Sequence, residues 1–91
     1  MADILGQYDK AIEHYEKAMA SDLKTFGPEH PNVATVWNNL GLAWASKGET
    51  NKAIGYYEKA RENWEKAGLD HYVKIAEDNL AAARRKKDGQ K

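Results

Sequence analysis

The sequence predicts an all-α protein made of antiparallel helix-turn-helix repeats, and three observations support this prediction. Apolar side chains recur at the i, i+3/i+4, i+7 spacing of a half-buried helix in two stripes, residues 36–44 and 53–64. Gly48 lies between the stripes, where a glycine commonly ends a helix. The segment GQYDKAIEHYEKA, which begins at Gly6, recurs 42 residues later as GETNKAIGYYEKA. A repeat at a fixed period is typical of a solenoid, in which each unit covers the apolar face that its neighbour leaves open.

The boundaries of the expected helices follow from the turn-forming residues between the stripes. Residues 27–28, a Gly-Pro pair, end the first helix, and Pro31 suits the first turn of the second. Gly48 ends the second helix, and the side chain of Thr50 or Asn51 is expected to cap the third. We therefore expect a single domain over residues 1–91 with four helices, at about residues 7–26, 32–47, 51–67 and 71–87.

The phase of the stripes identifies the expected core. Leu40 and Trp44 are expected to lie buried between the two central helices. Gly41 and Ala53 are small residues in the middle of apolar helix faces, where a glycine otherwise costs about 1 kcal/mol relative to alanine. We therefore expect another backbone to approach closely at these two positions.

Eight positions of the central stretch match a known repeat pattern. They hold a tryptophan, a Leu-Gly pair, an aromatic residue, a turn glycine and then an Ala-aromatic-Ala series. The matching residues are Trp37, Leu40, Gly41, Trp44, Gly48, Ala53, Tyr57 and Ala60. In these positions the chain resembles the tetratricopeptide repeat family. The 42-residue period and the FGPEHPNVA connector resemble the kinesin-light-chain-like variety of that family.

The resemblance implies that each repeat is a pair of antiparallel helices, A followed by B. The first helix of this chain matches the second of a repeat, so the chain corresponds to helices B, A, B and A. That arrangement is one complete repeat between two half repeats. The function implied is a non-catalytic protein–protein interaction module, which holds a peptide or a partner helix in a concave groove.

The A helices are expected to line this groove with the stripe that faces away from the core. The residues concerned are Thr35, Asn38, Asn39, Leu42, Asp78, Asn79 and Arg85. An asparagine amide carries both donors and an acceptor, so it suits the backbone of an extended peptide almost irrespective of the peptide's side chains. For Asn39, which matches Asn79 in the last helix, a structural role is an equally good interpretation.

A second hypothesis, from a different class, is a structural solenoid fragment that associates with copies of itself. The terminal helices are expected to leave uncovered the faces that carry Ile12, Tyr15, Met19, Ile75 and Leu80. Such faces would stack chains head to tail, or the Gly48 turn would open and let two chains exchange helices.

Composition and charge favour a protein partner. Fourteen basic and fourteen acidic side chains cancel, so net charge favours neither a nucleic acid nor a membrane. The chain has no cysteine, no signal-peptide pattern and no apolar run near the roughly 20 residues that span a bilayer. We therefore expect a soluble, cytoplasmic protein that binds another protein or a peptide. The basic run at residues 84–87 is interpreted as a solvated helix end that complements the helix dipole, with binding of an acidic peptide, an anionic lipid or a nucleic acid as the alternative.

Residue types used in catalysis and metal binding are present but are not arranged for it. The histidines lack the i, i+4 pairing of a zinc-binding helix, and no glycine-rich phosphate loop occurs. Glu29–His30 and Asp70–His71 resemble a base with its orienting acid. Because both pairs occupy the same place in the repeat, a structural connector explains them. We therefore expect neither an enzyme nor a bound metal or cofactor.

Overall fold

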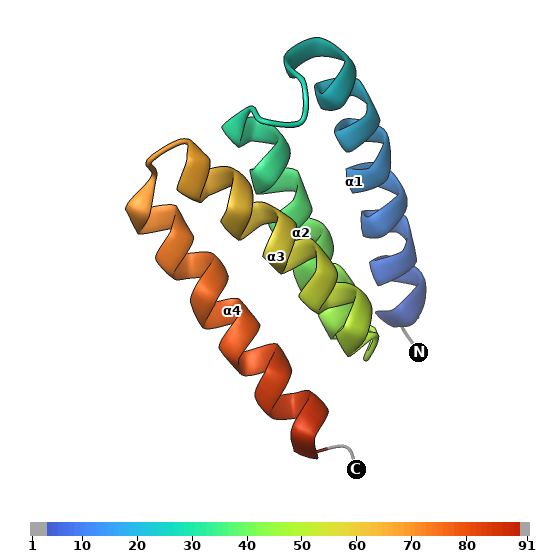
Figure 1. Ribbon diagram of the computed structural model, residues 1–91. Coiled ribbons are helices and arrows are strands. Elements are labelled where there is room, and N and C mark those ends of the chain that lie inside the picture. Colours follow the sequence, from blue (N-terminus) through green and yellow to red (C-terminus); the bar gives the residue numbers. More distant parts are fainter. Residues whose placement is uncertain (1–3, 90–91) are drawn as a thin grey trace.

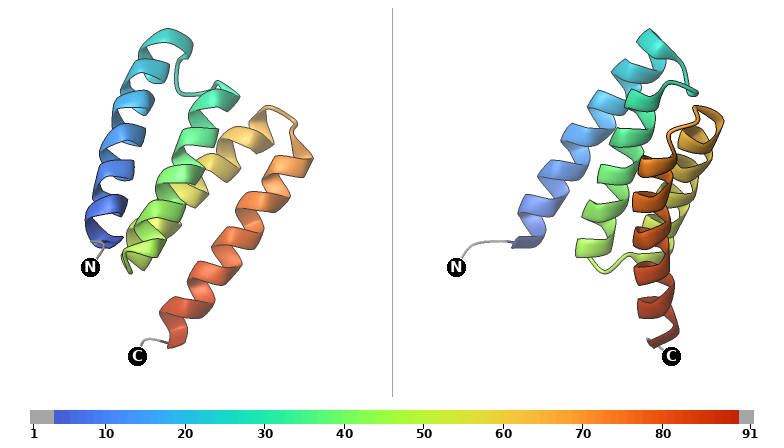
Figure 2. Two further views of the ribbon diagram at one scale, coloured as in Figure 1. Left: turned by 180° about the vertical axis from the view of Figure 1, so that it is seen from behind. Right: turned by 90° about the vertical axis from the view of Figure 1, so that its left-hand side faces the viewer.

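The chain forms four α-helices that pack in sequence order (Figure 1). The computed structural model describes residues 4–89, so residues 1–3 and 90–91 of the expected domain lie outside the description. The helices are α1 (Ile4–Phe26), α2 (Pro31–Ser46), α3 (Thr50–Lys66) and α4 (Asp70–Gly89). Each helix runs antiparallel to the one before it and packs against it (Figures 1 and 2). The described part of the chain contains no strand, and the predicted all-α class of antiparallel helix pairs is confirmed.

Each of the three connectors contains a glycine in the left-handed backbone region. Gly27 has a φ of 83°, Gly48 of 88° and Gly68 of 73°, values that residues with a Cβ rarely adopt. Gly6 occupies the same repeat position as Gly48 but lies inside α1 with an ordinary helical φ. The helix therefore begins at Ile4 rather than at residue 7.

The second and third helices begin in different ways. Pro31 is the first residue of α2, and Nδ1 of His30 caps the helix by accepting a hydrogen bond from the backbone N–H of Asn32 at 3.1 Å. For α3 the predicted side-chain cap is wrong, because the helix already begins at Thr50 and the side chain of Glu49 makes no capping bond. The backbone N–H of Glu49 instead donates to a carbonyl in the last turn of α2 at 2.9 Å, which leads the chain directly from one helix into the next.

Leu40 is the central residue of the core between α1 and α2. It is 0 % exposed, as predicted, and packs with Ile12 and Ala43. Trp44, which was expected to be buried beside it, is only half-buried. It borders a surface hollow where α1, α2 and α3 come together, so part of the indole faces solvent.

The predicted close approach at Gly41 is made by a ring and not by a backbone. A Cβ on Gly41 would lie 2.5 Å from Cε1 of Tyr57, which projects from α3. Burial of this ring raises the pKa of Tyr57. Ala53 continues the same packing, since it joins Tyr57, Leu80 and Ala83 in the cluster between α3 and α4. Small residues thus bring α3 close to both of its neighbours.

A buried asparagine ties α3 to the connector between α1 and α2. Nδ2 of Asn63 donates to the carbonyl of Pro28 at 2.9 Å and to that of His30 at 3.1 Å. A buried amide needs acceptors, and these two bonds from Asn63 fix the path of the connector. The sequence gives no signal for this role, because the partners are backbone atoms 33 and 35 residues away.

The terminal helices turn their large apolar residues inward, which corrects the predicted self-association faces. Ile12 is buried, and Tyr15 and Met19 are half-buried against the same cluster between α1 and α2. Leu80 is buried between α3 and α4, and of the five predicted residues only Ile75 is exposed. Each terminal helix packs mainly against the helix next to it in the sequence, and apolar burial directs its largest side chains toward that helix.

Candidate protein-binding surface

The seven residues predicted to line a groove lie on α2 and α4, which a hydrogen bond joins side by side. We refer to these residues together as the α2–α4 face. Asn38 is buried, and Asn39 and Asn79 are half-buried. The exposed members are Thr35, Leu42, Asp78 and Arg85. The face therefore has a polar centre that is partly enclosed and a rim that is open to solvent.

The hydrogen bond at the centre of this face connects two asparagines. Nδ2 of Asn79 donates to Oδ1 of Asn38 at 3.0 Å. Nδ2 of Asn38 and Oδ1 of Asn79 make no hydrogen bond within the described residues, and neither atom is closed off from solvent. The sequence pattern matches Asn79 with Asn39, but the structure pairs it with Asn38. One donor and one acceptor are thus presented together at the junction of the helices.

The rim of the face carries an apolar side chain and two charges. Leu42 is 45 % exposed, so it offers apolar surface that a partner can cover. Asp78 and Arg85 make no ion pair with any described residue, so both charges remain available. The hydroxyl of Thr35 is different, because it donates to the carbonyl of Pro31 in its own helix at 3.3 Å.

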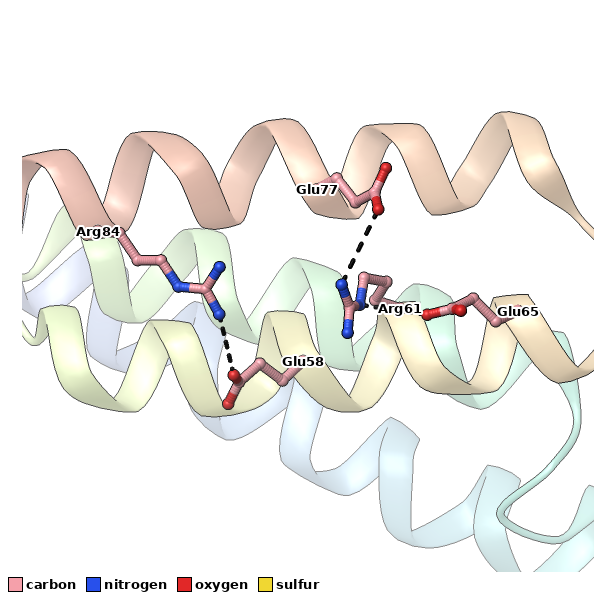
Figure 3. Close-up of polar contacts among 5 residues, drawn as sticks. All are labelled: Glu58, Arg61, Glu65, Glu77 and Arg84. Atoms are coloured by element: carbon pink, nitrogen blue, oxygen red, sulfur yellow. Dashed lines mark hydrogen bonds and ion pairs between the residues drawn. The ribbon is translucent and has the colours of Figure 1, made fainter.

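A second stripe of α4 forms ion pairs with α3 (Figure 3). Nη2 of Arg84 lies 3.1 Å from Oε2 of Glu58, and Nη1 of Arg61 lies 3.9 Å from Oε2 of Glu77. Arg84 holds the repeat position that Trp44 holds in α2, so an aromatic ring is replaced by an exposed ion pair. Because the paired side chains are about half exposed, each pair is expected to contribute only about 0–1 kcal/mol.

His30 in the connector before α2 and His71 at the start of α4 both make structural contacts. The imidazole of His30, besides capping α2, stacks on Phe26 with ring centroids 4.3 Å apart. His71 meets the ring of Tyr72 edge-on at 5.9 Å. Within residues 4–89, no three His, Asp or Glu side chains are grouped to hold a metal ion. None of the described helices combines the length and apolar character that crossing a membrane requires.

Comparison with known proteins identifies the family. The sequence model of the tetratricopeptide repeat matches residues 2–66, and the chain therefore belongs to the tetratricopeptide repeat family. Repeats of this family generally mediate protein–protein interactions and are generally non-catalytic. The RNA polymerase-associated protein CTR9 of Saccharomyces cerevisiae is 39 % identical to the chain over 70 residues, which cover 75 % of the chain and 6 % of that protein. No solved structure shows significant similarity to the chain.

Proposed function

We propose that the chain is a non-catalytic interaction module that binds an extended peptide or a partner helix on the α2–α4 face. The observation that carries the proposal is the pair of unused amide atoms at the junction of the two helices, Nδ2 of Asn38 and Oδ1 of Asn79. A peptide unit has one N–H and one C=O, which complement this acceptor and this donor. Each such bond is expected to contribute about 0.5–1.5 kcal/mol, largely independent of the sequence bound.

The rim supplies affinity and selectivity. Covering Leu42 with an apolar side chain of the partner removes a half-exposed leucine from water, and full burial of such a side chain contributes about 1.5–3 kcal/mol. Asp78 and Arg85, which make no ion pair with any residue that the structure describes, favour a ligand with opposite charges at matching positions. The best ligand on this account is an extended segment with an apolar anchor between charged residues.

The yeast relative is consistent with a protein partner. Its name describes it as associated with RNA polymerase. Since the chain spans only 6 % of that protein, its particular partners are not assigned to this chain.

We also propose that the chain belongs to the kinesin-light-chain-like variety of the family. The 42-residue period supports this, as does the connector in which His30 caps a helix that begins at Pro31. The His-Pro part of the Gly-x-x-His-Pro connector therefore has a physical role: the histidine caps the helix and the proline begins it.

The interaction is tested by photo-crosslinking in cells that express the full chain. Benzoylphenylalanine replaces Leu42 on the α2–α4 face or, as a control, Ser21, which is exposed on α1. We expect discrete protein adducts from position 42, weakened by Asn79→Ala, and none of the same mass from position 21. Identical adducts from both positions, or no adduct from position 42, would contradict the proposal.

A second candidate function, self-assembly, is favoured by an internal comparison between α1 and α3. Ala11 and Ala18 of α1 are half-buried, whereas their repeat counterparts Ala53 and Ala60 are fully buried. The difference arises because α3 packs between two helices and α1 against one. If a helix of a second copy covered the open side of α1, Ala11 and Ala18 would become as buried as Ala53 and Ala60.

Light scattering coupled to size exclusion tests self-assembly over a hundredfold range of concentration. If the chain self-assembles, its mass rises with concentration. In the Ala18→Glu variant the mass returns to the monomer value, because the added charge faces the open side of α1. A monomer mass throughout the range eliminates this candidate and leaves the interaction module.

A further inference from the structure

The side of the molecule formed by α1 and α3 carries two adjoining hollows. One is bordered by Glu16 of α1, Trp44 of α2 and residues between 52 and 59 of α3. The other is bordered by Trp37 of α2 and further residues of α3. Lys59 borders both, so the hollows follow each other along α3. We refer to the following lining residues as the aromatic trough: Trp37, Trp44, Tyr56, Lys52 and Lys59.

Lysines lie over the rings of this trough. Nζ of Lys52 is 4.2 Å from the centroid of the Trp44 ring. Nζ of Lys59 is 5.7 Å from the centroid of Trp37 and 5.8 Å from that of Tyr56. All three rings are half-buried, so each presents part of its surface to solvent. The cation–π attraction holds both ammonium groups above the aromatic rings.

Two lysines of this trough are not held in ion pairs. Lys52 and Lys59 make no ion pair with any described residue. The carboxylates that border the hollows are Glu16, Glu29 and Glu62, and of these Glu62 pairs with Lys66 at 3.4 Å. Lys52 and Lys59 therefore remain available to the acidic side chains of a ligand.

The trough also contains an uncharged hydrogen-bond donor, the phenol of Tyr56. It stays protonated, because burial and the charge of Glu16 raise its pKa against the opposing influence of Trp44. Nε1 of Trp44 is closed off from solvent, so Trp44 offers a ligand its ring and not its N–H.

The spacing of the lysines suits a ligand in the polyproline II conformation. Lys52 and Lys59 are separated by seven residues of one helix, or about 10.5 Å along its axis. A polyproline II segment returns to the same side every third residue and advances roughly 9.3 Å in doing so. Its backbone carbonyls are free, and its prolines pack well on aromatic rings.

We propose that the aromatic trough binds an acidic, proline-rich peptide segment in the polyproline II conformation. Acidic residues at every third position lie beside Lys52 and Lys59, and the prolines between them cover the exposed parts of the rings. This surface shares no residue with the α2–α4 face, so the two binding proposals succeed or fail independently.

The probe is a synthetic peptide of four Pro-Pro-Glu repeats, titrated into the full ¹⁵N-labelled chain. We expect the indole N–H signals of Trp37 and Trp44 to shift, whereas that of Trp64, which is buried in the core, stays in place. Peptides of Pro-Pro-Lys and of Gly-Gly-Glu repeats separate the contributions of charge and conformation. Both are expected to bind at least about tenfold more weakly, a change of about 1.4 kcal/mol.

A pair of charge-reversal variants tests the named lysines. Lys52→Glu combined with Lys59→Glu is expected to raise the Kd of the Pro-Pro-Glu peptide about tenfold or more. Lys74→Glu combined with Lys86→Glu makes the same change in net charge on exposed positions of α4 and is expected to leave the Kd unchanged. Thermal melts of both variants confirm that each remains folded.

Three results would overturn the proposal. The first is the absence of shifts at millimolar peptide. The second is an equal loss of affinity in the two double variants, which would indicate attraction by net charge alone. The third is a set of shifts centred on Leu42 and Asn79, which would place the peptide on the α2–α4 face.

Discussion

Replacing Leu40 with alanine is expected to lower the free energy of unfolding by about 2–5 kcal/mol. Leu40 is 0 % exposed and packs with Ile12 and Ala43, so the smaller side chain leaves a cavity between α1 and α2. A chain of 91 residues has a total stability of roughly 5–15 kcal/mol, so this single change removes a large part of it. Urea unfolding followed by circular dichroism measures the loss.

Leu42→Ala is the matched control for this measurement. It is the same substitution in the same helix, but Leu42 is largely in contact with water. We expect a change within about 0.5 kcal/mol, as for most surface substitutions. If the two variants lose equal stability, the orientation of α2 described here is wrong.

Trp64→Ala is expected to have an effect of similar or greater size, about 3–5 kcal/mol. Trp64 is 3 % exposed and forms one cluster with Ala34 of α2, Ala60 of its own helix and Ala76 of α4. Trp37, Leu69 and Val73 also pack against this cluster, so removal of the indole takes away a contact that several side chains share. It leaves a cavity where α2, α3 and α4 meet.

Tyr72→Ala provides the aromatic control for Trp64→Ala. The centroid of the Tyr72 ring lies 5.3 Å from that of Trp64, but Tyr72 is 45 % exposed although its sequence position suggests an inward side chain. Its removal is expected to cost clearly less, on the order of 1 kcal/mol. Equal losses in urea unfolding of the two variants would show that Trp64 is not the centre of this cluster.

The architecture is largely predictable from the sequence because it depends on local signals. Gly48 ends one helix and Pro31 begins another, and each affects only residues close to it in the sequence. The burial of Leu40 follows from helical periodicity in the same way. The cap of α3 is not predictable by this logic, since the backbone of Glu49 bonds to the preceding helix and no side chain is used.

The site is less predictable because it depends on pairs of residues that are distant in the sequence. The sequence places Asn38 and Asn79 on the correct helices, but the bond between them follows from the packing of α2 beside α4. The double role of Asn63, which holds a connector through two carbonyls, has the same origin. Ile12 and Leu80 were predicted to be uncovered but are buried, since the stripe of a terminal helix does not reveal which of its sides is covered.

A chemical-shift map with the natural partner is the most direct test of the claim that the α2–α4 face is the binding surface. The partner segment crosslinked at position 42 is synthesised as a peptide and titrated into the ¹⁵N-labelled chain. We predict that the side-chain amides of Asn38 and Asn79 and the backbone amide of Leu42 shift together and saturate with one Kd. Shifts confined to α1 and α3, with both asparagine amides stationary, would contradict the claim.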